Sequence, residues 1–344
     1  MIEAIPFPIM IVGRNQQVAE VNAALRDLLG ADVAGRHFIA ALRQPLLVAA
    51  VEAAFATGQP GRARFLRRSE GHETLYDVTI RPHDGQVVLS FEDHTAAQEI
   101  GQLRRDFVAN VSHELRTPLT ALFGFIETLR GPARDDAAAR DRFLAIMERE
   151  ATRMIRLVDD LLSLSKVEED ERRRPSEPVV LGDLLRTALA ELDPVVQSAG
   201  ARVTLHDDSA GLAVPGDPRQ LRQVIGNLIE NAVKYGGPDN RVTVALSAVG
   251  PVRALRGDGV TLEVSDTGPG IPEHHIPRLT ERFYRVDSHR SREVGGTGLG
   301  LAIVKHIVNR HRGRLVITST PGAGTRVSVT LPAGTGPAPP AIGE

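Results

Sequence analysis

The sequence has no cysteine among its 344 residues. This absence excludes disulfides, thiolate metal sites, a cysteine nucleophile and any cofactor attached through sulfur. The sequence also has no surplus of charge of either sign, because 41 lysines and arginines face 43 aspartates and glutamates. With a formal net charge of −2, the composition gives no reason to expect nucleic acid as a direct partner.

Long hydrophobic runs are missing as well. The most apolar stretch, residues 38–55, is interrupted by charged and polar residues and by Pro45, whereas a membrane-spanning helix needs about 20 nearly uninterrupted apolar residues. We expect this stretch to form a buried helix. The first eleven residues contain Glu3 and two prolines and no basic region, which is unlike a secretory signal. These features predict a cytoplasmic protein, either free or associated with the inner face of the membrane.

The first part of the chain, residues 1–95, has the pattern of a small α+β domain. Alternating apolar residues and turn signals predict short strands there. The expected strands cover residues 9–12, 18–21, 62–67, 75–81 and 87–91. Between the second and third of them, Asn22 is a predicted helix N-cap, and Gly30 is predicted to end that helix at its C′ position.

The order of these elements resembles a PAS sensor module. Residues 91–95, Phe-Glu-Asp-His-Thr, match the Asp-x-Thr ending of that family. The resemblance implies that this domain receives a signal. His37, His72 and His83 could in principle ligate haem, but their spacing is not diagnostic, and ordinary surface or core histidines are the favoured interpretation.

The next part, residues 96–170, changes to a helical period. Apolar residues recur every three or four positions along two stripes, which are separated by Gly131-Pro132. The first stripe contains Ile100, Leu103, Phe107, Val111, Leu115, Leu119, Leu122, Ile126 and Leu129, and the second contains Phe143, Met147, Met154, Val158 and Leu161. We therefore expect two long helices in an antiparallel hairpin. Because a lone hairpin leaves both stripes exposed to water, we expect two chains to form a four-helix bundle, that is, a homodimer.

A charged run without apolar residues, residues 168–175, predicts a linker with a domain boundary near its end. Beyond it, residues 176–333 mix strands and helices and predict an α/β sandwich. The expected strands are 178–181, 203–205, 242–247, 260–265, 314–319 and 326–331, and the expected helices are 218–235 and 301–311. The last segment, 334–344, is rich in proline and glycine, which predicts disorder. The expected fold class is thus a multidomain α+β protein.

The first candidate site lies on the first long helix. At about 100° per residue, His113 lies about 200° around the helix from Val111 of the apolar stripe, so it faces water or a partner. Thr117 lies only about 40° around the helix from His113. Glu114 can accept a hydrogen bond from the imidazole Nδ1, which leaves Nε2 unprotonated and nucleophilic. Pro118 removes a helical donor, so we expect the helix to bend one turn after the histidine.

The second candidate site is assembled from separate segments of the C-terminal domain. On the expected helix 218–235, Asn227, Asn231 and Lys234 lie at positions i, i+4 and i+7 and share one face. They offer two amides to a hydrated Mg²⁺ and one cation to a phosphate.

An apolar strand ends at Asp266, which is followed by Thr-Gly-Pro-Gly-Ile. The Asp266 carboxylate can accept a hydrogen bond from an exocyclic amine, and Gly268 and Gly270 allow a flat ring to approach the backbone. This segment therefore suits an aromatic ligand that carries an amine.

A glycine-rich segment, residues 295–300, opens the last expected helix. Its free N–H groups and the positive end of the helix predict an anion site. The segment is not a Walker A loop, because no Gly-Lys-Ser/Thr follows, and it fails the Gly-x-Gly-x-x-Gly pattern because Leu301 stands where the third glycine belongs. The preceding residues 281–287, followed by the polar and charged residues 288–293, predict a mobile lid over a nucleotide.

Taken in order, these motifs resemble the sensor histidine kinases of two-component systems. They are His-Glu-Leu-Arg-Thr-Pro from 113, Asn-Leu-Ile-Glu-Asn-Ala-Val-Lys-Tyr from 227, Asp-Thr-Gly-Pro-Gly-Ile from 266, Glu-Arg-Phe-Tyr-Arg-Val-Asp from 281 and Gly-Gly-Thr-Gly-Leu-Gly-Leu from 295. The resemblance covers about residues 97–332. It implies autophosphorylation from Mg-ATP, transfer of the phosphoryl group to an aspartate of a response regulator, and removal of that phosphate.

The resemblance also implies a role for each motif residue. His113 is the phosphoacceptor, Glu114 is its base, and Thr117 helps to place water when phosphate is removed from the regulator. Arg285 contacts the γ-phosphate, and Lys234 contacts the phosphates. Mg²⁺ is assigned to Asn227 and Asn231, adenine to Tyr235 and Asp266, and the other nucleotide contacts to Gly268, Gly270, Gly296, Thr297, Gly298, Leu299 and Gly300.

Within the family, residues 281–286 and 291–308, together with the PAS-like domain, look most like the phosphate-regulon sensor kinases. This similarity implies a role in phosphate-starvation signalling. Because those kinases usually carry an N-terminal membrane segment, it also implies either a membrane anchor outside this sequence or a membrane-bound upstream partner.

Two other classes of protein share parts of the pattern. An ATP-driven conformational clamp uses the same nucleotide fold but would not need His113 and Glu114. A dimeric PAS scaffold with an inactive ATP site would not need intact Asn231 and Asp266. We favour the kinase because donor and acceptor chemistry occur on one chain.

Overall fold

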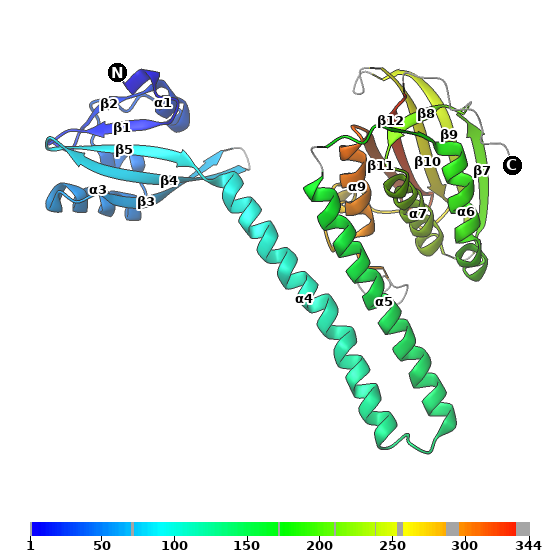
Figure 1. Ribbon diagram of the computed structural model, residues 1–344. Coiled ribbons are helices and arrows are strands. Elements are labelled where there is room, and N and C mark those ends of the chain that lie inside the picture. Colours follow the sequence, from blue (N-terminus) through cyan, green and yellow to red (C-terminus); the bar gives the residue numbers. More distant parts are fainter. Residues whose placement is uncertain are drawn as a thin grey trace. The chain divides into compact units, whose positions relative to one another are not determined.

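The computed structural model describes residues 2–69, 72–170, 173–209, 211–237, 239–252, 257–286 and 296–334. The chain divides into two compact units, Met1–Ala109 and Asn110–Glu344 (Figure 1). Four sequence predictions fall partly outside the described residues: residues 171 and 172 of the expected linker, the second half of the expected lid from Asp287 on, Gly295 of the glycine-rich segment, and the expected disordered tail from residue 335 on.

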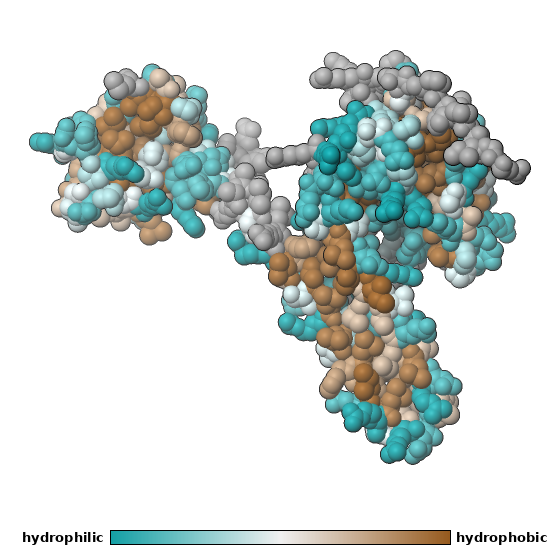
Figure 2. Space-filling view, in the orientation of Figure 1, coloured by the Kyte–Doolittle hydropathy of each residue, from teal (hydrophilic) through white to brown (hydrophobic). Residues whose placement is uncertain are grey.

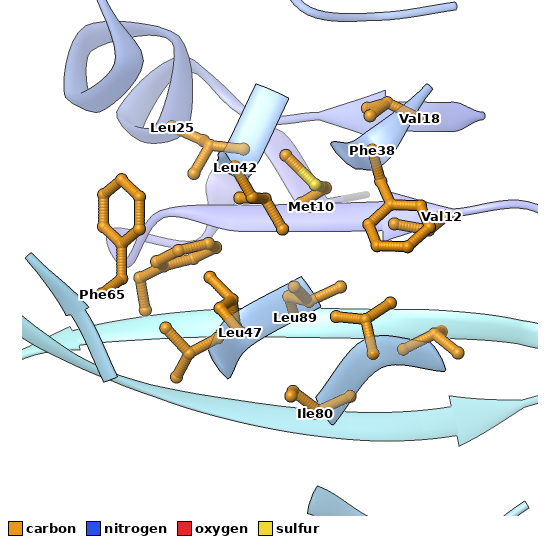
Figure 3. Close-up of a cluster of buried hydrophobic side chains, with 14 of the residues drawn as sticks. Met10, Val12, Val18, Leu25, Phe38, Leu42, Leu47, Phe65, Ile80 and Leu89 are labelled. Carbon is orange, nitrogen blue, oxygen red and sulfur yellow. The ribbon is translucent and has the colours of Figure 1, made fainter. Parts of the chain in front are cut away.

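The first unit contains a five-stranded antiparallel sheet with the strand order β2-β1-β5-β4-β3. The strands are β1 (Ile9–Val12), β2 (Val18–Val21), β3 (Gly61–Ser69), β4 (His72–His83) and β5 (Gln86–Asp93). The helices are η1 (Ile2–Ala4), α1 (Ala23–Leu29), α2 (Phe38–Leu42) and α3 (Pro45–Thr57). Side chains such as Met10, Phe38, Leu47 and Leu89 converge between this sheet and the helices in a fully buried core (Figure 3).

The predicted caps of α1 are confirmed. The Asn22 side chain is fully buried, and its Oδ1 accepts hydrogen bonds from the backbone N–H of Leu25 (3.1 Å) and of Ile9 (2.9 Å). Gly30 closes the helix with a left-handed φ of 69°. Asn22 thus satisfies one of the free donors at the start of the helix and also joins the helix to β1.

The prediction of one helix over residues 38–55 was wrong, because the structure has two. Arg43 adopts a left-handed φ of 50° after α2, and Pro45 begins α3 at its first turn. Between them the Gln44 side chain bonds the backbone of Leu66 on β3 in both directions, at 2.7 and 3.1 Å. A proline cannot continue a preceding helix, so the chain turns here and presents two short helices to the sheet.

A helical hairpin follows, formed by α4 (Thr95–Arg130) and α5 (Ala137–Glu169). The helix α4 continues through Pro118, and the predicted break at Gly131-Pro132 lies just after its end. Asp136 caps α5 by accepting from the N–H of Ala139 at 2.9 Å. The helix α5 reaches Glu169, so the first two residues of the expected linker are helical instead.

Hydrophobic side chains gather along this hairpin (Figure 2). Several remain exposed in the single chain, among them Leu119 at 61%, Phe123 at 63% and Leu162 at 66%. No helix in the described part of the chain is long and apolar enough to cross a membrane.

The second compact unit carries a five-stranded mixed sheet with the order β11-β12-β10-β9-β7. Its strands are β7 (Arg202–Asp208), β9 (Arg241–Val252), β10 (Gly257–Asp266), β11 (Arg314–Thr320) and β12 (Gly324–Pro332), and only the β7–β9 pair is parallel. The helices α6 (Leu181–Ser198), α7 (Pro218–Tyr235) and α9 (Gly300–Arg310) pack against this sheet and against one another. The result is the predicted α/β sandwich (Figure 1).

Two further elements differ from the prediction. The segment expected as a strand over 178–181 is β6 (Glu177–Val180), which pairs with β8 (Ala213–Gly216) in a separate two-stranded sheet. Leu181 already begins α6, a helix that the sequence prediction did not include.

His311 connects the end of α9 to the start of α7. Its ring is fully buried; Nδ1 lies 2.7 Å from the carbonyl of Ile307, and Nε2 accepts from the N–H of Asp217 at 3.0 Å. Asp217 in turn caps α7, since its carboxylate accepts from the N–H of Arg219 at 3.0 Å. Burial lowers the pKa of His311, so the ring is held neutral.

Candidate functional site

A cavity of about 620 Å³ opens where α7, β10, the segment after η2 (Glu273–Arg278) and the start of α9 meet, and α5 contributes to its wall. Most nucleotide-contact residues predicted from sequence line this one cavity. They are Asn227, Asn231, Lys234, Tyr235, Asp266, Gly270, Arg285, Gly296, Thr297, Gly298 and Gly300. Two predicted residues do not line it: Leu299 is fully buried in the core, and Gly268 packs against Gly236.

Asp266 lies at the end of β10 with its two carboxylate oxygens in different roles. Oδ1 accepts from the backbone N–H of Gly268 at 2.8 Å and from that of Thr325 at 3.3 Å. These bonds fix the side chain and leave Oδ2 as the oxygen to offer to a ligand in the cavity. Burial raises the pKa of Asp266, and the two backbone N–H groups oppose that effect.

The glycines near Asp266 serve close backbone packing. Gly270 has a left-handed φ of 69°, and a Cβ on it would lie 2.1 Å from the carbonyl oxygen of Thr320. A Cβ on Gly268 would lie 2.7 Å from the Cα of Gly236. Any side chain at either position must displace backbone, so Gly270 in the cavity wall and Gly268 behind it both allow close backbone packing.

The face of α7 presents the predicted amides and cation. The Asn227 Nδ2 donates to the carbonyl of Gly300 at 3.2 Å, which joins α7 to the start of α9 and leaves its Oδ1 for other contacts. Lys234 forms an ion pair of 2.6 Å with Glu230, one turn earlier. Lys234 is therefore already paired with a carboxylate at the cavity wall.

The helix α5 places carboxylates in the same cavity. Asp160 Oδ2 accepts a hydrogen bond of 2.7 Å from the hydroxyl of Thr297, and Asp159 also lines the wall. Burial raises the pKa of Asp160; its bond from Thr297 opposes the shift, and the nearby charge of Glu230 adds to it. Asp160 belongs to no motif of the sequence, and only the packing of α5 beside α9 brings it to the site.

The predicted phosphoacceptor is exposed. His113 lies on the solvent-facing side of α4, and the Thr117 hydroxyl donates to the His113 carbonyl at 3.2 Å. Pro118, which is buried, has no N–H with which to bond the carbonyl of Glu114. The imidazole is thus accessible, as the helical angle predicts.

Glu114 has partners other than the adjacent histidine. Its Oε2 accepts from Nη2 of Arg153 on α5 and from Nη2 of Arg285 after η2, each at 3.0 Å. The Arg285 side chain is only 8% exposed. In this arrangement the predicted base on α4 and the predicted phosphate-binding arginine neutralise each other.

A cluster around Tyr284 was not expected from the sequence. The Tyr284 hydroxyl lies 2.5 Å from Nδ1 of His275, and the Arg278 guanidinium lies over the ring, 4.2 Å from its centroid. Tyr284 lines the cavity directly before Arg285. No local pattern indicates this cluster, because η2 and residues 281–286, which we call the lid stem, meet only in the folded chain.

The comparisons with known proteins agree with the motifs. The His kinase A (phospho-acceptor) domain family matches residues 103–170, and the family of histidine kinase-, DNA gyrase B- and HSP90-like ATPases matches residues 216–335. The phosphate regulon sensor protein PhoR of Pseudomonas aeruginosa is 41% identical over 258 residues, which are 75% of this chain and 55% of that protein. The sensor protein kinase WalK of Staphylococcus aureus is 39% identical over 246 residues, 71% of this chain and 57% of that protein.

The chain spans between 39% and 57% of the length of these curated relatives and of WalK from Staphylococcus saprophyticus. Among solved structures, the histidine kinase ThkA in complex with the response regulator protein TrrA is similar in fold, with a TM-score of 0.53 and 21% identity. That match covers 96% of this chain and 97% of the ThkA chain. On the two family matches and the similarity to these relatives, the chain belongs to the sensor histidine kinases of two-component systems.

Proposed function

We propose that this chain binds Mg-ATP in the cavity beside α7 and phosphorylates itself on His113. The observation that carries the proposal is the presence of both halves of the reaction on one chain. The cavity offers a carboxylate for adenine and a helix start for phosphates, and α4 offers an exposed imidazole. Family membership supports this reading of both parts.

The adenine end of the cavity has a polar floor and apolar walls. The Asp266 Oδ2 can accept from the exocyclic amine of adenine, because Oδ1 is occupied by backbone donors. The apolar residues that line the cavity and suit a flat ring are Val264, Ile271, Leu279, Ile317 and Val327. At the other end, the free N–H groups at the start of α9 suit phosphates.

The residues present also fit Mg²⁺. Asn227 retains a free amide oxygen after its bond to Gly300, and Asn231 lines the cavity one turn further along α7. Amide oxygens are suitable hard ligands for a Mg²⁺ that keeps several waters and is shared with phosphates. When bound, the ion neutralises charge that develops on the phosphates.

The chemistry at α4 is a nucleophilic displacement. Nε2 of His113 attacks the γ-phosphorus, the bond from that phosphorus to the β-bridging oxygen breaks, and the electron pair leaves with ADP. Glu114 accepts the Nδ1 proton that the phosphorylated ring no longer retains. Glu114 must first leave Arg153 and Arg285, which frees Arg285 to bind the γ-phosphate.

The exposed apolar stripe of the hairpin supports a homodimer. Side chains such as Phe123 and Leu162 would be covered in a four-helix bundle formed by two hairpins. The partner for phosphotransfer is a response regulator, the class of protein with which ThkA forms a complex.

The first unit serves as a PAS-like sensor in this proposal. Its first and last strands, β1 and β5, are neighbours in the sheet, and β5 leads directly into α4. The Asp-x-Thr segment fastens that start, because Asp93 accepts from the N–H of Thr95 at 2.9 Å and the Thr95 hydroxyl accepts from the N–H of Leu75 at 2.9 Å. A signal in this domain can therefore reach α4. The similarity to PhoR supports phosphate starvation as the condition sensed.

Removal of phosphate from the regulator is a second candidate activity. Thr117 lies one turn beyond His113 on the same exposed face, where its hydroxyl can place a water against an acyl phosphate. We expect Thr117→Ala to phosphorylate itself normally while it loses about a hundredfold in the dephosphorylation rate. Unchanged decay of a phosphorylated regulator in the presence of ADP would remove Thr117 from this activity.

The test of the kinase proposal is incubation of the purified chain with ATP labelled in the γ-phosphate. Label that is lost in acid and survives alkali identifies phosphohistidine. ATP turnover without label would support the conformational clamp, and neither turnover nor label would support the scaffold.

A further inference from the structure

Tyr284 is held from two directions by residues of η2. Its hydroxyl meets Nδ1 of His275 at 2.5 Å, and the Arg278 guanidinium covers its ring at 4.2 Å. Arg278 is itself oriented by an ion pair of 3.3 Å with Glu281. A tyrosine that is bonded at its hydroxyl and stacked at its face has little freedom to change rotamer.

The hydrogen bond between His275 and Tyr284 joins a neutral ring to a phenol. Partial burial lowers the pKa of His275, and the neighbouring His274 and Arg278 lower it further, so the ring is neutral near pH 7. The tautomer with its proton on Nε2 accepts at Nδ1 from the Tyr284 phenol, and the tautomer with its proton on Nδ1 donates to the phenol oxygen. In both cases His275 holds the Tyr284 hydroxyl from η2.

The residues on both sides of Tyr284 explain why its position matters. The Phe283 N–H donates to the carbonyl of Gly298 at 2.9 Å, so the lid stem rests on the glycine segment. The next residue, Arg285, has a buried Nε without a hydrogen-bond partner among the described residues. The hydrogen bonds of Arg285 therefore fix its side chain only in part. The direction of its guanidinium also depends on how firmly the backbone of Phe283 and Tyr284 is held.

We propose that His275 is a positioning residue for phosphoryl transfer: through Tyr284 it aims Arg285 at the γ-phosphate. This inference rests on the proposed function, because it concerns the arginine assigned there to the phosphate. His275 touches neither the nucleotide nor His113 in this role. It acts through the Tyr284 hydroxyl and holds the lid stem against η2.

The test compares His275→Ala, Tyr284→Phe and their double variant in full-length protein. We expect each single variant to lower the rate of self-phosphorylation at saturating ATP roughly tenfold, because Arg285 is aimed less well when the bond that positions Tyr284 is lost. The double variant should fall no further than either single one, because both remove the same bond. The Kd for ATP should stay within about twofold, which also shows that the variants fold.

Two matched variants separate positioning from general packing. His275→Asn keeps an amide that can accept from or donate to the Tyr284 hydroxyl, and it should recover most of the rate. His274→Ala removes the ring whose centroid lies 4.0 Å from that of His275, and it should leave the rate near wild type. Equal losses in His274→Ala and His275→Asn, or full rates in His275→Ala and Tyr284→Phe, would overturn the positioning role. A wild type that acquires no label would overturn the proposed function and this inference with it.

Discussion

Asp160 on α5 accepts a hydrogen bond of 2.7 Å from the Thr297 hydroxyl, at the start of α9. The start of α9 is the positive end of that helix, and its N–H groups favour an anion. A carboxylate from the hairpin therefore occupies the part of the cavity where the proposed function places phosphates. Asp159 adds negative charge to the same wall, where Glu230 is paired with Lys234.

We predict that Asp160→Asn binds ATP more tightly. Removal of one like charge close to the phosphates is worth about 1–2 kcal/mol in a partly buried site, or roughly five- to thirtyfold in Kd. Calorimetric titration with a non-hydrolysable ATP analogue measures this change. Ser163→Ala is the matched control, since Ser163 joins α5 to Gln223 on α7 and does not line the cavity. Unchanged or weaker binding by Asp160→Asn would show that α5 does not compete with phosphate.

We predict that Asp266→Asn weakens ATP binding and reduces the preference for ATP over GTP. The amide oxygen must serve the N–H groups of Gly268 and Thr325, so the NH₂ group faces the amine of adenine, donor against donor. Loss of a hydrogen bond to a charged group costs about 1.5–3 kcal/mol, which is roughly ten- to 150-fold in Kd. Calorimetry with both nucleotides measures it. Equal affinity of the wild type for ATP and GTP would refute the role of Asp266.

We predict that His311 makes the stability of the second unit depend on pH. The folded state holds this ring neutral, whereas the unfolded chain takes up a proton near the ordinary pKa of about 6.5. The unfolded state therefore binds more protons below that pH, and the free energy of unfolding falls as pH falls, by at most about 1.4 kcal/mol per pH unit. Denaturant midpoints at pH 7.5 and 5.5 measure this loss.

The variant His311→Gln supplies the comparison for that experiment. It should be less stable than wild type at pH 7.5, because the bonds to Asp217 and Ile307 are weakened. The difference between the two proteins should shrink at pH 5.5. A constant difference would mean that His311 does not titrate on unfolding.

Local features of the fold could be predicted from the sequence because they depend on neighbours in the chain. Asn22 was recognisable as a helix cap, and it accepts the expected N–H group of Leu25. The helix α6 was not predicted; Pro194 lies within it, where a proline normally indicates a helix end. The two helices at residues 38–55 were merged because their shared apolar character outweighed the signal of Pro45.

The candidate site likewise has residues that local sequence spacing predicts and contacts that only tertiary packing creates. Asn227, Asn231 and Lys234 share a face of α7 by helical spacing alone, and Asp266 follows an apolar strand. Asp160 could not be predicted, because its place beside Thr297 depends on the packing of α5 against α9. The same holds for His275 with Tyr284 and for the ion pair between Glu114 and Arg285, whose partners are 171 residues apart.

The proposed function requires the exposed imidazole of His113 to receive the γ-phosphoryl group of ATP. The most direct test locates the label in wild type and in His113→Gln, after both proteins are shown to bind nucleotide equally. We expect acid-labile, alkali-stable label on the peptide that contains His113 in the wild type, and none in the variant. Label that persists in His113→Gln would rule out this histidine as the phosphoacceptor.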